Sequence, residues 1–257
     1  MHIEKIAVAG KTIEITRYHN GRYGIKGVQR GKNIATTKES QEAVNRRRAE
    51  ERLRLLLNEN FGPGDFHLSL NYIPGNRPQD AEEMKKDAER FLRRMRAAFR
   101  REGREMKYIH VMEVGARGAR HHHIVINHID TKTVQKYWDK GRVHIHPLDE
   151  SGQYRQLASY LIKYSDRMLH EDGRLMGKRW YASRNLRQPK VTRRIIKSKT
   201  IRPDPTPRRG YYIDQDTVRY GVSGYNGYPY LTYTLVRIKE DKHERRLGRQ
   251  GPHNRDV

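Results

Sequence analysis

Residues 119–127 have the sequence ARHHHIVIN, in which three adjacent histidines precede an apolar, β-branched run. Such a run predicts a β-strand. Because side chains two residues apart on a strand share a face, we expect His121 and His123 to project together and His122 to point the opposite way. Two imidazoles held side by side are able to chelate one divalent cation.

A second strand is predicted just upstream, at residues 108–114 (YIHVMEV), and a glycine-containing turn joins the two. In such a hairpin Glu113 lies beside His121 and His123. Two imidazoles and one carboxylate leave coordination positions open for water or a phosphate oxygen, as a catalytic metal site requires. The sequence therefore predicts a site for Mn²⁺ or Mg²⁺, with Zn²⁺ as an alternative, formed by Glu113, His121 and His123.

The same residues leave two alternatives open. A histidine run at the end of a strand is also typical of a solvated segment without a metal. His144 and His146 alternate on a short strand predicted at residues 142–146 and form a rival pair, but no acidic strand precedes them and Pro147 ends the run.

A tyrosine-rich helix is predicted at residues 153–169 and contains Tyr160, Lys163 and Tyr164. His-x-His after a Glu-bearing strand, followed by Tyr-x-x-Lys on a helix, resembles the HUH endonuclease superfamily and most of all its rolling-circle replication initiators of bacterial plasmids and phages. The resemblance covers residues 66–185 and implies an α+β fold, the HUH endonuclease fold, with a central antiparallel sheet flanked by helices. This chain departs from the superfamily at His122, where a bulky apolar residue is usual, and in having a second tyrosine at 164.

The resemblance also implies an activity, that of a DNA endonuclease and ligase. The enzyme would nick single-stranded DNA at an origin in a metal-dependent transesterification, leave a 5′-phosphotyrosine and a free 3′-OH, and later rejoin the strand. Tyr160 would be the nucleophile, assisted by Lys163 one turn later, and Tyr164 would be a second nucleophile or a packing residue. The implied partners are single-stranded DNA or an origin hairpin, together with a host helicase and polymerase.

Composition agrees with a nucleic-acid partner. The 257 residues include 54 Lys and Arg against 30 Asp and Glu, which gives a formal net charge of +24 and favours a polyanion as ligand. The absence of cysteine leaves histidine and carboxylates as the metal ligands. With no apolar run of membrane-spanning length and no apolar core after Met1, we expect a cytoplasmic protein of a bacterial host that does not bind membranes.

Candidate DNA contacts lie in two basic regions. The first is a helix predicted to end near residue 58, and the second is the segment 178–209, whose one acidic residue is Asp204. Cations can hold phosphates there while aromatic rings stack on unpaired bases. The predicted contacts are Arg46, Arg47, Trp180, Tyr181, Arg184, Arg187, Lys190, Arg193 and Arg194.

Breaks in pattern divide the chain into four parts. Residues 1–60 form a hairpin and a basic helix, and residues 61–190 form the endonuclease core. On the core, Phe66, Leu68 and Leu70 share one face of a strand, and a long amphipathic helix begins near residue 78. Residues 191–238 form a basic linker and a small β-rich appendage, and residues 239–257 a disordered charged tail.

Three rival functions remain open from sequence. A relaxase or a single-tyrosine transposase would use the same chemistry on another substrate. A non-enzymatic nucleic-acid-binding protein would need the charge and the aromatic residues but no metal. A metal-dependent hydrolase would use water as the nucleophile and form no covalent adduct.

Overall fold

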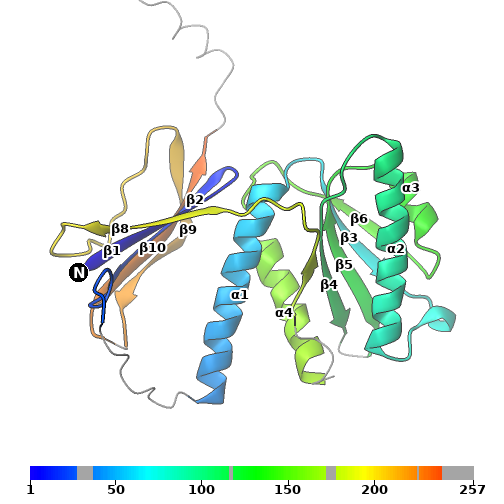
Figure 1. Cartoon of the computed structure of the whole chain (residues 1–257), viewed down its shortest axis with the longest axis horizontal. Coiled ribbons are helices and arrows are strands. Elements are labelled where there is room, and N and C mark those ends of the chain that lie inside the picture. Colours follow the sequence, from blue (N-terminus) through cyan, green and yellow to red (C-terminus); the bar gives the residue numbers. More distant parts are fainter. Residues whose placement is uncertain (28–36, 116–117, 172–177, 225, 239–257) are drawn as a thin grey trace, which may run out of the picture. The chain divides into compact units, whose positions relative to one another are not determined.

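The computed structural model describes residues 1–27, 37–115, 118–171, 178–224 and 226–238, with the backbone alone for 166–171 (Figure 1). The chain divides into two compact units. Unit 1 consists of Met1–Gln29 and Val191–Val257, and unit 2 consists of Arg30–Lys190. Each unit contains one five-stranded sheet.

The sheet of unit 2 has the strand order β6-β3-β5-β4-β7, and its paired strands are antiparallel. Its strands are β3 (Phe66–Asn71), β4 (Tyr108–Val114), β5 (Arg120–Ile126), β6 (Val143–Pro147) and β7 (Tyr181–Ala182). The helices of this unit are α1 (Lys38–Asn60), α2 (Ala81–Arg101), α3 (Thr131–Tyr137) and α4 (Arg155–Glu171), with a short 3-10 helix, η1, at Pro74–Asn76.

Helices cover both faces of this sheet (Figure 1). On one face, which we call the α2 face, Leu68 and Leu70 of β3 pack with Phe91 and Met95 of α2. On the other, the α4 face, apolar side chains of β4 and β5 pack against α1 and α4. These are Leu53 and Leu57 of α1, Ile109 and Val111 of β4, Val125 of β5, and Ala158, Leu161 and Ile162 of α4. Alternation along each strand therefore decides which helix layer a side chain meets.

Local sequence explains where the two long helices begin. The side chain of Thr37 caps α1 by accepting a hydrogen bond from the Ser40 backbone N–H, and Asp80 caps α2 by accepting one from Glu83. Apolar residues of α2 recur every three or four positions and are buried, as the amphipathic pattern predicts. Arg100 and Arg101 in its last turn complement the helix dipole.

Unit 1 joins the two ends of the described chain in one sheet, with the strand order β8-β1-β2-β10-β9. Its strands are β1 (His2–Ala9), β2 (Thr12–His19), β8 (Lys190–Ile196), β9 (Tyr211–Val222) and β10 (Pro229–Arg237). The carboxylate of Glu4 is buried between Arg17, 2.9 Å away, and Arg194, 2.6 Å away. Burial would raise the pKa of Glu4, but the two guanidinium groups outweigh it and the pKa is lowered.

The structure confirms the α+β prediction, including the antiparallel sheet flanked by helices. The division into parts differs from the predicted one, because the hairpin at the N-terminus pairs with β10 instead of forming a separate part with α1. The predicted tail at 239–257 lies outside the described residues. None of the helices that the structure describes has the length and apolar character needed to cross a lipid bilayer.

Candidate active site

The register of the unit 2 sheet brings the predicted metal ligands together on the α4 face. Glu113 of β4 lies directly opposite His121 of β5, and His123 lies opposite Val111. All four side chains share a face because each strand alternates with period two. The predicted hairpin geometry is therefore present.

Glu113 and His123 are in direct contact. The Nε2 atom of His123 lies 2.6 Å from Oε2 of Glu113, and both residues are almost fully buried. His121 is half-buried, and its Nδ1 atom is buried without a hydrogen-bond partner. Burial lowers the pKa of His121 against the opposing effect of Glu113, so the ring is neutral near pH 7 and able to act as a ligand.

These residues fit a divalent cation in their chemistry. A carboxylate and two imidazoles form a mixed oxygen and nitrogen donor set, and the unpartnered Nδ1 of His121 is a lone pair or N–H that the fold itself leaves unused. Among the residues that the structure describes, no three His, Asp or Glu side chains converge as a complete metal site. The hydrogen bond between His123 and Glu113 would have to open for both to bind one ion.

A third histidine, His67 of β3, belongs to this cluster and was missed by the sequence analysis. Its Nε2 atom lies 3.2 Å from Nδ1 of His123, and the hydroxyl of Ser69 also lies 3.2 Å from that atom. Burial, together with His123 and His146, lowers the pKa of His67 to about 3. A signal was present, since His67 and Ser69 alternate with the apolar residues Phe66, Leu68 and Leu70 on the strand.

The rival pair lies on the same face, one strand further out. In the β3–β6 ladder His146 pairs with His67 and His144 pairs with Ser69. The ring of His146 lies 6.0 Å from that of His67, and both His144 and His146 are exposed. The two predicted pairs are thus parts of one row of imidazoles across the sheet, not separate sites.

Both tyrosines of α4 lie over this row. The ring of Tyr160 is 5.3 Å from His123 and 6.0 Å from His67, and that of Tyr164 is 5.7 Å from His123 and 4.5 Å from Tyr160. Tyr160 is 39% exposed, so its hydroxyl can be reached from solvent. The helix therefore brings the predicted nucleophile to the predicted metal ligands.

The surroundings of Tyr160 disfavour its phenolate. Partial burial, Tyr164 and Glu113 together raise its pKa to about 12. Lys163 is exposed on the next turn of the helix. A nucleophilic role for Tyr160 therefore needs an acceptor for its proton or positive charge beside it.

His122 points to the α2 face, as the alternation predicts, and forms part of a buried polar chain. Its Nε2 atom lies 2.7 Å from the hydroxyl of Tyr72, and its Nδ1 atom lies 3.0 Å from Nε2 of His110. Burial lowers the pKa of His110 to about 3 and that of His122 well below its usual value. Both rings are neutral.

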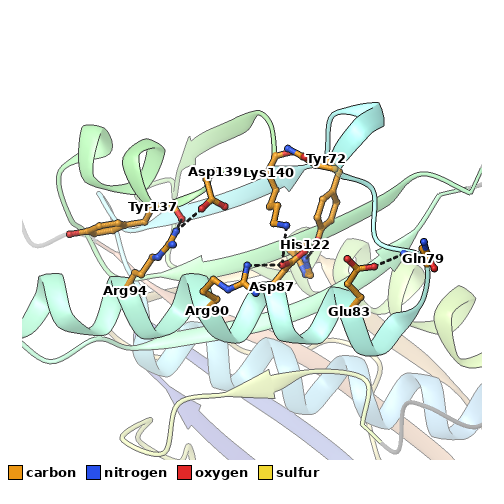
Figure 2. Close-up of polar contacts among 11 residues, drawn as sticks. Tyr72, Gln79, Glu83, Asp87, Arg90, Arg94, His122, Tyr137, Asp139 and Lys140 are labelled. Carbon is orange, nitrogen blue, oxygen red and sulfur yellow. Dashed lines mark hydrogen bonds and ion pairs between the residues drawn. The ribbon is translucent and has the colours of Figure 1, made fainter.

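The other end of this chain reaches the buried carboxylate of Asp87 on α2 (Figure 2). Arg90 and Lys140 approach Asp87 Oδ1 to 3.4 and 3.6 Å. Burial and the nearby Asp87 carboxylate raise the pKa of Tyr72, so its hydroxyl stays protonated. The departure from the apolar residue expected at 122 is thus accommodated by polar partners.

The predicted DNA contacts are dispersed over both units. In unit 2, Arg46, Arg47, Arg184 and Lys190 are exposed, while Arg187 is exposed but lies 3.4 Å from Glu59. Trp180 packs on the core below α4, and the half-buried ring of Tyr181 stacks 6.0 Å from His110. In unit 1, Arg193 is exposed and Arg194 is bound to Glu4. Arg194 therefore has a structural contact that competes with any role in binding phosphates.

Comparison with known proteins supports the sequence resemblance. The searches of curated proteins and of solved structures found no match. A family model described as a replication-associated protein of the ORF2 type matches residues 65–168. That range runs from the start of β3 into α4 and contains Glu113, His121, His123, Tyr160 and Lys163. Residues 65–168 therefore constitute a domain of this replication-associated protein family, as expected of a rolling-circle replication initiator.

Proposed function

We propose that this protein is a replication initiator that nicks single-stranded DNA at an origin and joins itself to the 5′ end. The observation that carries the proposal is the position of the half-exposed Tyr160 ring, 5.3 Å from His123 and on the same side of the sheet as Glu113 and His121. A phenol, two imidazoles and a carboxylate are the groups that a metal-dependent transesterification needs.

In the proposed step the Tyr160 hydroxyl oxygen attacks the scissile phosphorus. The new bond joins this oxygen to phosphorus, and the bond between phosphorus and the 3′ oxygen breaks. The phenolic proton passes to water or a neighbouring base, and the 3′ oxygen takes up a proton to leave as a free 3′-OH. Rejoining is the reverse reaction, with a 3′-OH as nucleophile and Tyr160 as leaving group.

Glu113, His121 and His123 would hold the divalent cation. When bound, the cation would polarise the scissile phosphate and offset the negative charge that develops on it. The exposed Lys163 would supply positive charge to the phenolate or the phosphate from one helical turn away. Tyr164 would take the second nucleophilic step or act in packing.

The test is trapping of a protein–DNA adduct. The full chain is incubated with a pool of single-stranded oligonucleotides and Mn²⁺, and protein-linked DNA is detected by denaturing electrophoresis and located by mass spectrometry. We expect an adduct on Tyr160 that Tyr160→Phe and EDTA both abolish. Tyr212→Phe, which removes an exposed hydroxyl from unit 1, is the matched control and should react as wild type.

Each competing function has its own outcome. DNA on Tyr164 alone would reverse the roles of the two tyrosines. Cleavage without an adduct would indicate a hydrolase that uses water, and binding without cleavage a nucleic-acid-binding protein. A relaxase or transposase would give the same adduct, so these are separated by the substrate, a circular origin-bearing single strand that the initiator nicks and recloses.

A further inference from the structure

A cavity of about 620 Å³ lies on unit 2 away from the tyrosines. Four arginines line it, three from the C-terminal part of α2 and the loop after it and one from the loop after β7: Arg96, Arg100, Arg104 and Arg184. The volume is within the range of about 300–1,000 Å³ that is usual for ligand pockets. Its one acidic lining residue is Glu105, so the charge of the lining is strongly positive.

The arginines differ in what already binds them. Arg104 is fixed, since it contacts Glu102 at 3.0 Å, donates to the His128 carbonyl at 2.7 Å and lies over the Phe99 ring. Arg96, Arg100 and Arg184 are exposed, and within the described residues their side chains have no ion pair or hydrogen bond. Three guanidinium groups with all their donors available face one cavity.

The remaining polar groups of the lining are fixed by protein contacts. The side-chain amide of Asn185 donates to the Glu105 carboxylate at 3.1 Å and to the Met106 carbonyl at 3.3 Å. The hydroxyl of Ser183 accepts a hydrogen bond from the Tyr108 backbone N–H. The loop after β7 is thus held against the start of β4, so Arg184 is presented from an anchored segment.

The position of this cavity separates it from the candidate active site. Tyr108 in its lining begins β4, whereas Glu113 lies five residues later on the same strand. At about 3.3 Å per residue the two are roughly 17 Å apart along the strand. Tyr108 also packs in the core of the α2 face, whereas Glu113 faces α4. One phosphate cannot occupy both places.

We propose that this cavity, the arginine pocket, binds backbone phosphates of the DNA at a distance from the nicked bond. Arginine forks match phosphate oxygens in geometry and charge. A separation of roughly 17 Å corresponds to at least about five nucleotides at 3.4 Å each. The wall formed by residues 182–185 lies outside the range matched by the family model. The inference rests on the proposed function in that the ligand is taken to be the nicked DNA.

The experiment compares two lengths of the same single-stranded substrate. A short oligonucleotide of about six nucleotides spans the nick, and a long one extends it by about ten nucleotides on each side. Dissociation constants are measured by fluorescence anisotropy for wild type, for the triple variant Arg96→Gln, Arg100→Gln, Arg184→Gln, and for a control. The control is Lys86→Gln, Lys132→Gln, Lys136→Gln, which removes the same charge from exposed positions outside the pocket.

We expect the arginine variant to lose at least about tenfold in affinity for the long substrate and to have a salt slope smaller by about two, since each phosphate contact on a single strand contributes about 0.7. Its affinity for the short substrate should stay within twofold of wild type, and the control should change little on either. Equal losses on both lengths, or an equal loss in the control, would overturn the proposal.

Two further readings separate other causes. Calorimetric titration with inorganic pyrophosphate tests a free phosphate compound as ligand, and tight binding that the arginine variant loses, without any length effect on DNA, would overturn the DNA assignment. Adduct formation is measured in the same samples. Its absence from wild type would contradict the proposed function, whereas a wild-type adduct with no length effect would contradict the arginine pocket alone.

Discussion

The two faces of the unit 2 sheet use histidine in opposite ways. On the α4 face His121 has a buried nitrogen without a partner, and the cluster lies under a half-exposed tyrosine. On the α2 face His110 and His122 are buried, and His122 has a partner at each nitrogen. His122 and His123 are neighbours in sequence, yet only the second lies beside the candidate nucleophile. A histidine run is therefore interpreted by alternation and partners, not by its length.

The sharpest way to break this comparison is to exchange the same residue on the two faces. We expect His123→Leu to reduce adduct formation by more than about 100-fold, beyond the loss for a residue that only supports a metal ligand. His121→Ala should do the same, and DNA affinity should persist because phosphate contacts supply most of it. Single-turnover nicking measures the loss. Full activity in both variants would contradict the metal site.

His67→Gln tests how far the active face extends. Because His67 contacts Nδ1 of His123, its loss should misplace that ring and lower the nicking rate about 10- to 100-fold. DNA affinity should not change. His144→Gln, an exposed histidine two positions from His146 on the same face, is the matched control. A larger loss from His144→Gln than from His67→Gln would move the site to the rival pair.

His122→Leu tests the closed face by stability instead of rate. The substitution removes the partner of both the Tyr72 hydroxyl and His110 Nε2, and an unsatisfied buried polar group costs about 1–3 kcal/mol. We expect the free energy of unfolding in urea to fall by that order. Nicking by the folded variant should remain within a few-fold of wild type. A stable variant without activity would place His122 in the active site.

The smallest effect is a dependence of stability on pH. The folded pKa of His110 is about 3, below the value of about 6.5 for an unfolded histidine, so its neutral ring stabilises the fold above pH 6.5. This contribution is lost as the pH falls from 6.5 toward 3, by about 1.4 kcal/mol per unit. Urea unfolding at several pH values should give a shallower slope for His110→Gln than for wild type. The exposed His128→Gln is the control, and an equal change there would contradict this assignment.

Local pattern was sufficient for much of the fold and for the main residues of the site. Alternation predicted which of His121, His122 and His123 share a face, and apolar spacing predicted the buried side of α2. The pairing of β2 with β10 was beyond prediction, because the two strands are more than 200 residues apart and neither sequence names its partner. His67 was missed for a related reason, since its nearness to His123 depends on the pairing of β3 with β5.

The sheet of unit 1 has a consequence for the order in which the chain folds. β1 and β2 are made first, but the strand that pairs with β2 on its other side, β10, begins at Pro229, after all of unit 2. At about 5–20 residues per second, the ribosome adds β10 roughly 10–40 s after β2. Unit 2, whose contacts lie within Arg30–Lys190, can fold during this delay, while the hairpin presents an unpaired strand edge. Synthesis that stalls before residue 229 would thus release a chain with a folded unit 2 and an aggregation-prone edge at β2.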